Sequence, residues 1–326
     1  MKLELRSIRV KNCGPLDDVR VEFYDDQGKT LPVCVLAGAN GSGKTTLLEV
    51  IVGMARHSGS RLPSRLRNLE YAQLDFLIEG QEYSVVLGEK PSDVVLSANE
   101  MSIIHISKDR PSSNTLLNRI MKQDLQQQNV EREFPGFAPH LVNGNRPPSI
   151  LYFPHTRSLE PVSGAQVTKE KLPYEFVHRF DVVRSFSGSL NSYLVWLDYA
   201  EPEQFKAAQS FLNELDFEGK TFHVQRKTLD VIVRTRDGHE HKLHELSSGE
   251  QNLLILLMEL RRRLLPHSIV LIDEIENSLH PAYQHKLAQA LLKMQQMIPF
   301  QLIVTTHSWE IAEIFGASAV RVLTKF

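Results

Sequence analysis

The sequence predicts an α/β fold in which a parallel sheet is flanked by helices. Three short apolar runs support this prediction: VCVLA at 33–37, SIVLI at 268–272 and FQLIV at 300–304. A strand that is buried on both faces of a parallel sheet has such a continuous apolar composition. Segments with apolar residues at helical spacing separate the runs, and this alternation of strands with helices is typical of a parallel sheet.

The N-terminal part of the chain has the pattern of a β lobe. Alternating apolar residues predict strands at 2–10 and 18–24, and a turn then leads to the strand at 33–37. The segment YAQLDFLIEGQEYSVVLG alternates on both sides of its EGQ, which predicts a hairpin at 71–88. Residues 108–148 are rich in Gln, Pro, Gly and Asn, and we interpret them as an insertion.

The middle of the chain predicts a helical lobe and a small hairpin. A short strand at 149–153 is followed by helical patterns over 189–215, where Pro202 suits a first helical turn. Residues 221–240 predict a hairpin, and the apolar segment 252–265 predicts a long helix.

Composition limits the class of protein. The chain has 326 residues, of which 42% are hydrophobic, so it can bury a large core. Its net charge is −2, so no global basic field indicates nucleic acid, and a DNA contact requires a local patch. The most basic stretch is 56–67, which either contacts phosphates or is a solvated face. Cys13 and Cys34 have the spacing of neither a zinc site nor a disulfide framework.

The chain also lacks the signals of secretion and membrane insertion. Its first twelve residues have no apolar core of the signal-peptide kind, and no apolar run approaches the ~18 residues of a membrane span. We therefore expect a cytoplasmic protein that has no membrane partner.

Residues 38–46, GANGSGKTT, match the phosphate-binding pattern GxxxxGK[ST]. In that pattern backbone N–H groups surround an anion, the lysine reaches the β/γ-phosphates and the hydroxyl holds Mg²⁺. A Gly-rich turn is the alternative, but the strand before and the helix after supply the context that the motif needs. The predicted nucleotide-binding residues here are Gly38, Asn40, Gly41, Ser42, Gly43, Lys44, Thr45 and Thr46.

Two carboxylates follow the apolar run at 268–272, where an α/β sheet presents its ligands. We expect Asp273 to belong to the Mg²⁺ shell, together with Thr45. We expect Glu274 to orient or deprotonate the attacking water. An acidic loop that caps the next helix is the alternative.

ELSSGEQ at 245–251 precedes a helix, and TTHS at 305–308 follows the next apolar strand. On its own, ELSSGEQ is a Ser/Gly helix start whose free N–H groups can accept an anion, and a plain N-cap explains it almost as well. Together and in this order, GANGSGKTT, LSSGE, VLIDE and TTHS resemble an ABC-type ATPase. The resemblance aligns LSSGE with the LSGGQ signature and implies a switch histidine. The residues concerned are Ser247, Gly249, Glu250 and His307.

DEIENSLHP at 273–281 resembles the DEPExxLHP run of the OLD/RecF/SMC-like branch, whose members include SMC proteins, RecF and AbiEii-type ATPases. Three departures are visible: Ile275 replaces the family's proline, Glu250 replaces the signature glutamine, and the family's glutamine loop is not obvious in the sequence. YFPHTR at 152–157 resembles the family's YxPxxR segment and implies that His155 lies near the metal. No sustained heptads of an SMC arm are present, so a compact member is implied.

The resemblance implies a P-loop NTPase of ABC type with an N-terminal β lobe, a mixed or parallel core sheet and a helical lobe. It implies ATP and Mg²⁺ as ligands, with Glu274, His307 and Lys44 as catalytic residues. It also implies a homodimer in which the phosphate loop of one copy and Ser247 of the other enclose each ATP. The expected divisions of this single domain are 1–107 (nucleotide-binding lobe), 108–148 (insertion), 149–240 (helical and hairpin lobe) and 241–326 (signature, carboxylate and histidine core).

The biological role that the resemblance implies is phage defence or DNA repair. The leading hypothesis is a switch that hydrolyses ATP and regulates a DNA-associated process or a partner effector. One alternative is an ATP-bound scaffold that holds a separately encoded nuclease or toxin. A self-contained nuclease is a further class, but few residues follow His307, so we expect the nuclease to be absent or to lie on another chain. Residues 108–148 and 158–188 are candidate docking surfaces.

Overall fold

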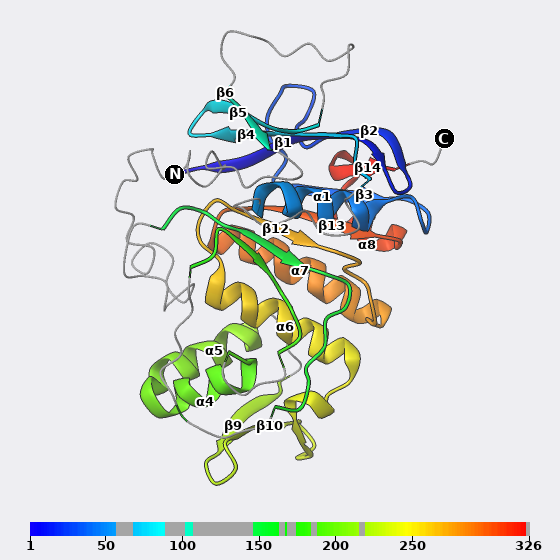
Figure 1. Cartoon of the computed structure of the whole chain (residues 1–326). Coiled ribbons are helices and arrows are strands. Elements are labelled where there is room, and N and C mark those ends of the chain that lie inside the picture. The colour runs from blue at the N-terminus through cyan, green and yellow to red at the C-terminus, as the bar shows by residue number, and fades with distance from the viewer. Residues whose placement is uncertain are drawn as a thin grey trace.

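The structure is a computed structural model, and its elements are stacked from an N-terminal sheet through a central sheet to a helical lobe (Figure 1). Of the predicted insertion at 108–148, residues 108–145 lie outside the described residues. The basic stretch at 56–67 also lies outside them, except for Arg56. The described residues are 1–56, 68–88, 102–106, 146–162, 167, 174–183, 188–214 and 219–323.

The central sheet is parallel at each of its described pairings and has the strand order β14-β3-β13-β12-β7-β8. The three apolar runs of the sequence form β3, β12 and β13, which confirms the predicted fold class. The short strands β8 and β14 were not predicted, because three residues carry too little periodicity. The strands are β3 (Val33–Ala37), β7 (Ile150–Phe153), β8 (Val177–Arg179), β12 (Ser268–Ile272), β13 (Phe300–Thr306) and β14 (Val320–Val322).

The register of this sheet gathers the ends of its strands along one edge. Ile272, the last residue of β12, is paired with Phe153 at the end of β7 and with Val304 in β13. Thr306, the last residue of β13, is paired with Ala37 at the end of β3. The residues that follow these strands therefore meet at the carboxyl edge, which is where open α/β sheets hold ligands.

The N-terminal sheet has the strand order β2-β1-β4-β5-β6 and is antiparallel except between β5 and β6. The predicted hairpin at 71–88 is confirmed. The first strand is longer than predicted, because Lys11 and Cys13 continue the pairing with Asp18 and Leu16. The strands are β1 (Leu3–Cys13), β2 (Leu16–Glu22), β4 (Tyr71–Ile78), β5 (Gln81–Leu87) and β6 (Ser102–Ile106).

Helix α1 (Lys44–Arg56) lies between the N-terminal sheet and the central sheet (Figure 1). On the opposite face of the central sheet lie the long helices α6 and α7. These and the two short segments after β13 have the following bounds: α6 (Ser248–Arg263), α7 (Pro281–Met297), α8 (Trp309–Phe315) and the 3₁₀ turn η3 (Ala317–Ala319).

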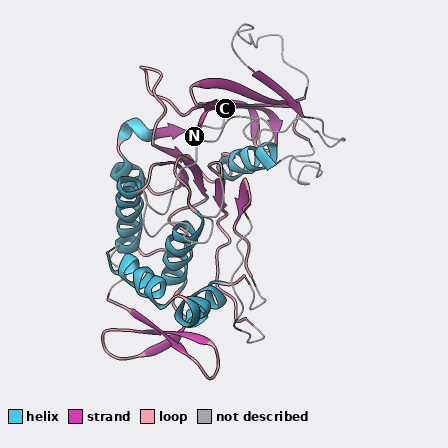
Figure 2. Cartoon of the chain, turned by 90° about the vertical axis from the view of Figure 1, so that its left-hand side faces the viewer, coloured by secondary structure: helices cyan, strands magenta, loops and turns pink. Residues whose placement is uncertain are grey.

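The helical lobe contains the predicted helix pair, and the second of these helices begins at Pro202 as expected. A small antiparallel sheet of order β11-β10-β9 lies at the end of the molecule far from the N-terminal sheet (Figure 2). None of the helices in the described ranges is both long enough and apolar enough to cross a bilayer. The lobe consists of α4 (Leu190–Ala200), α5 (Pro202–Glu214), β9 (Thr221–Gln225), β10 (Asp230–Arg234), β11 (Glu240–Lys242) and the 3₁₀ turn η2 (Leu243–Glu245).

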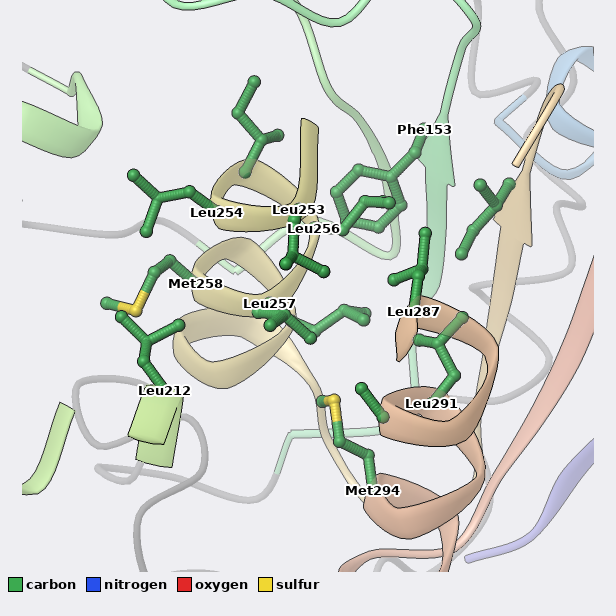
Figure 3. Packing of buried hydrophobic residues seen from close by; sticks show 14 of the residues in the cluster. Phe153, Leu212, Leu253, Leu254, Leu256, Leu257, Met258, Leu287, Leu291 and Met294 are labelled. Carbon is green, nitrogen blue, oxygen red and sulfur yellow. The ribbon is translucent and has the colours of Figure 1, made fainter. Parts of the chain in front are cut away.

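Side chains of the central sheet alternate between apolar clusters on its opposite faces. In β12, Val270 and Ile272 enter the cluster on the helical side, whereas Ile269 and Leu271 enter the cluster around α1. On the helical side, leucines of α6 pack against α7 and against Phe153 of β7 (Figure 3). This packing fixes α6, whose N-terminus carries the signature segment, against the sheet that carries the other motifs.

We predict that Leu257→Ala lowers the free energy of unfolding by about 2–5 kcal/mol, because it removes a fully buried side chain between α6 and α7. Val322→Ala is the matched control, because Val322 is 61% exposed, and it should change stability by less than about 0.5 kcal/mol. Urea unfolding measures both. Equal losses of unfolding free energy in the two variants would contradict the packing of Leu257 between α6 and α7.

Candidate functional site

The predicted phosphate loop joins β3 to α1, and packing requires glycine at two of its positions. A Cβ atom on Gly38 would lie 2.6 Å from the carbonyl oxygen of Leu323, and one on Gly43 would lie 2.3 Å from Cδ2 of Leu16. Gly43 also has a φ of +95°, which L side chains rarely adopt. The Oγ atom of Ser42 is buried in the loop and has no hydrogen-bond partner in the described ranges.

Lys44 begins α1 and folds its side chain back over this loop. Its Nζ atom donates to the carbonyl oxygens of Gly38 at 2.8 Å and Ala39 at 3.1 Å, and lies 3.2 Å from Nδ1 of His307. Burial lowers the pKa of this ammonium below its ordinary value, while nearby carboxylates oppose the shift. The cation is thus held where an anion on the loop would contact it.

Asp273 is the residue on which the predicted metal ligands converge. Its buried carboxylate accepts a hydrogen bond from Thr45 Oγ1 at 3.0 Å and from Thr305 Oγ1 at 2.7 Å. Nδ1 of His155 lies 3.1 Å from Oδ2 of the same carboxylate. Thr45, Asp273 and His155, which the sequence assigned to a metal site, therefore lie together.

The donor set at Asp273 fits Mg²⁺. This cation prefers oxygen ligands and usually takes only one or two carboxylates from the protein, with phosphates and water completing its shell. In the described part of the chain, no group of three or more His, Cys, Asp or Glu side chains is placed to hold a metal ion. Thr45 and Asp273 suit Mg²⁺ better than His155, because imidazole is not a preferred ligand of this cation.

Glu274 has a φ of +44°, which is uncommon for a residue other than glycine and is typical of functional sites. Hydrogen bonds hold its backbone on both sides. Its N–H donates to Oγ1 of Thr305 at 2.7 Å, and its carbonyl oxygen accepts from Nη2 of Arg157 at 3.0 Å. Oε1 of the partly exposed carboxylate lies 3.9 Å from Nε2 of His307.

One open cleft with a volume of about 620 Å³, a size that suits a nucleotide, lies beside these groups. Of the predicted site residues, Gly38, Ser42, Asp273 and His155 do not line it. The cleft brings together the predicted catalytic residues Lys44, Glu274 and His307. Its lining residues are Pro15, Asn40, Gly41, Gly43, Lys44, Thr45, Thr46, Glu274, Glu276, Asn277, Ser278 and His307.

Arg157 is a site residue that the sequence did not single out. Its buried guanidinium donates to the carbonyl oxygens of Pro154 and Asp273, both at 2.8 Å, and to Oδ1 of Asn252 on α6 at 2.5 Å. Burial lowers its pKa to about 10. The YFPHTR segment contains the signal for this residue, since Arg157 is the arginine of YxPxxR.

Glu276 is a second missed residue. Its Oε1 atom accepts the backbone N–H of His307, and its buried Oε2 atom has no hydrogen-bond partner within the described ranges. The preceding residue, Ile275, donates its N–H to the carbonyl oxygen of Thr305 at 3.1 Å. The family's proline could not make this bond. The departure at Ile275 thus adds a hydrogen bond between the segment after β12 and strand β13.

The signature segment begins α6 as the sequence predicted. Ser247 is the N-cap, and its Oγ atom accepts from the N–H of Glu250 at 3.3 Å. Glu250 completes a capping box, because its Oε2 accepts from the N–H of Ser247 at 2.9 Å and from its hydroxyl at 2.7 Å. Gly249 packs on the cleft's rim, where a Cβ atom would lie 3.1 Å from the carbonyl oxygen of Ser278. Ser247 caps α6, and Gly249 and Glu250 lie in its first turn. In the described residues, none of the three lines the cleft of its own chain.

Comparison with known proteins gives one family match. The family model described as "AAA domain, putative AbiEii toxin, Type IV TA system" matches residues 33–313.

The curated relatives include two retron proteins. The chain is 23% identical to "Retron Ec83 probable ATPase" of Escherichia coli over an alignment of 400 positions, which covers 99% of the chain and 72% of that protein. It is 36% identical to "Retron Vc95 probable ATPase" of Vibrio cholerae serotype O1 biovar El Tor over 92 residues, covering 24% and 17% of the two chains.

Among solved structures, the chain is similar to an SMC head domain from Thermotoga maritima, with a TM-score of 0.44 and 17% identity over 95% of this chain and 92% of that one. It is also similar to a dimeric bacterial ABC transporter cassette, with a TM-score of 0.38 and 14% identity over 99% and 100%.

We predict that Arg157→Met lowers the free energy of unfolding by about 3 kcal/mol, because it removes the donor of the buried carbonyl oxygens of Pro154 and Asp273. It should also weaken nucleotide binding, since Asp273 and Glu274 lose the group that holds their backbone. Urea unfolding and titration with a fluorescent ATP analogue measure the two effects. Arg226→Met, at an exposed arginine paired with Asp198, is the control and should change neither. If Arg157→Met has the same stability and the same nucleotide affinity as this control, Arg157 does not support the site.

Proposed function

The chain belongs to the family described as "AAA domain, putative AbiEii toxin, Type IV TA system", and from that premise we propose that it is an ATP-hydrolysing molecular switch. Two copies close around bound ATP and reopen after hydrolysis. The observation that carries the proposal is the convergence of Lys44, Thr45, Glu274 and His307 on one cleft, beside the buried carboxylate of Asp273.

In this proposal the phosphate loop and Lys44 bind the triphosphate. Backbone N–H groups at the start of α1 face the phosphates, and the ammonium of Lys44 exchanges its carbonyl contacts for the β/γ-phosphates. The Thr45 hydroxyl and the Asp273 carboxylate hold Mg²⁺, which neutralises phosphate charge when bound. His155 orients the Asp273 carboxylate through its hydrogen bond.

Glu274 acts on the attacking water, either as its proton acceptor or by orienting it. The two bonds that hold its strained backbone keep the carboxylate at the mouth of the cleft. His307 lies close to both Glu274 and Lys44, so its imidazole can contact the terminal phosphate and the water together. The Glu276 carboxylate holds the backbone of His307 in that place.

The second wall of the site comes from a second copy of the chain. The exposed N-terminus of α6 presents Ser247, and a helix N-terminus suits an anion. Within the described residues, Ser247 does not border the cleft of its own chain. A C₂ arrangement places each signature against the other copy's phosphate loop. Shifting such an equilibrium from 1:99 to 99:1 requires about 5.5 kcal/mol, which phosphate contacts from both copies can supply.

The relatives named as retron probable ATPases support a role beside a separate effector. We propose that ATP-dependent closure regulates a separately encoded nuclease or toxin, or a DNA-associated process, in phage defence or DNA repair. The alternative is a scaffold in which bound ATP stabilises an assembly and hydrolysis is secondary. Blocking ATP turnover at Glu274 distinguishes the two hypotheses. A scaffold keeps its partner bound without hydrolysis, whereas a switch no longer regulates its partner.

We predict that Glu274→Gln keeps ATP binding, slows turnover by at least about 100-fold and accumulates a dimer with ATP, because the amide keeps its shape but accepts no proton. Light scattering with ATP and a phosphate-release assay measure these effects. Glu313→Gln, at an exposed glutamate of α8, is the control and should behave as the wild type. Normal hydrolysis by Glu274→Gln would exclude Glu274 as the catalytic group.

We predict that Lys44→Ala and Ser247→Arg each prevent ATP-dependent dimerisation, whereas an equimolar mixture recovers part of it. In a heterodimer of the two variants, one ATP site contains both the altered loop and the altered signature. The other site has an intact phosphate loop from the Ser247→Arg chain and an intact signature from the Lys44→Ala chain. ATP-dependent association, with hydrolysis as a second readout, tests each variant and the mixture. Normal association by either single variant would contradict the shared site. No recovery in a mixture that demonstrably forms heterodimers would contradict it as well.

A further inference from the structure

The signature carboxylate of Glu250 forms an ion pair that the capping box does not explain. While Oε2 of Glu250 serves the cap, Oε1 lies 3.0 Å from Nζ of Lys220. The two side chains are 16% and 8% exposed, so the pair is shielded from water. Lys220 immediately precedes β9, and it lies 30 residues before Glu250 in the sequence.

Other contacts hold Lys220 in this position. Gln209 of α5 donates through Nε2 to the carbonyl oxygen of Lys220 at 3.0 Å, and its Oε1 accepts from the N–H of Phe222 at 2.6 Å. The backbone around Lys220 is therefore fastened to the helical lobe. Burial by itself would raise the pKa of the Glu250 carboxyl, but hydrogen bonds from Ser247 and Lys220 outweigh it and hold the pKa below its ordinary value.

A carboxylate at this place conflicts with an anion-binding helix start. Glu250 takes up the hydroxyl and the N–H of Ser247, which are the donors that a phosphate would need. Its negative charge also opposes the approach of a triphosphate, and the repulsion is stronger where water is partly excluded. A cation that neutralises the carboxylate without blocking the N-terminus of α6 removes the charge repulsion.

We propose that Lys220 is a positioning residue of the signature: it neutralises the Glu250 carboxylate and holds it in place, so that the triphosphate held by a second copy can approach Ser247. The proposal rests on the proposed function, because only a dimer brings that triphosphate to α6. It gives the helical lobe a direct part in the site, since Lys220 belongs to the connection between α5 and β9.

The experiment measures ATP-dependent dimerisation by sedimentation with Mg²⁺ and ATPγS for the full chain and four variants. Lys220→Met should weaken association by at least about tenfold, because it leaves the partly buried Glu250 carboxylate without its cation. Lys220→Arg should restore association to within about threefold of the wild type, because it keeps the charge. Lys206→Met is the control, since Lys206 forms an exposed pair with Glu203 on the same lobe, and it should associate normally.

The decisive variant is the double change Lys220→Met with Glu250→Gln. It removes both charges, so association should recover at least about fivefold relative to Lys220→Met alone. If the double variant is as weak as Lys220→Met, Lys220 has a merely structural role and the inference is wrong. Normal association by Lys220→Met also overturns it while leaving the proposed function intact. If the wild type does not associate with the nucleotide, the proposed function fails and this inference fails with it.

Discussion

The rest of the site depends on the buried carboxylate of Asp273 at the end of β12. A charge in that position is tolerated only if hydrogen bonds satisfy it, and each of its partners comes from another element. Thr45 belongs to α1, Thr305 to β13 and His155 to the segment after β7. The hydrogen bonds that satisfy this carboxylate therefore fix the phosphate loop, strands β12 and β13 and the segment after β7 relative to one another.

The contacts behind this carboxylate connect the cleft to the helical lobe. Arg157 joins the backbone of Asp273 to Asn252 on α6, and Asn252 donates to the carbonyl oxygen of Asn277 on the rim of the cleft. Gln251 of the same helix accepts the N–H of Leu159 through its side chain. Helix α6 is thus attached to the edge of its own cleft while its exposed N-terminus faces outward. A rearrangement around Asp273 has a physical route to the signature.

The sequence was sufficient to predict features that depend on local pattern. The strands β3, β12 and β13 are continuous apolar runs, and the phosphate loop and the Ser247 cap are motifs with fixed spacing, so each was found. Contacts between distant residues leave no such pattern. Arg157, Glu276 and the pair of Lys220 with Glu250 act through partners on other elements, and only the register of the parallel sheet brings the first two to the cleft.

The most direct test of the shared site is cross-linking between two variants, Ala39→Cys in the phosphate loop and Ser248→Cys in the signature. The native Cys13 and Cys34 are buried, and burial raises the pKa of both thiols, so the introduced cysteines are the reactive ones. A short bifunctional maleimide should join the two different chains efficiently with Mg²⁺ and ATP and poorly without nucleotide. Equal yields with and without ATP, or no mixed product when ATP binding is demonstrated, would contradict closure around the nucleotide.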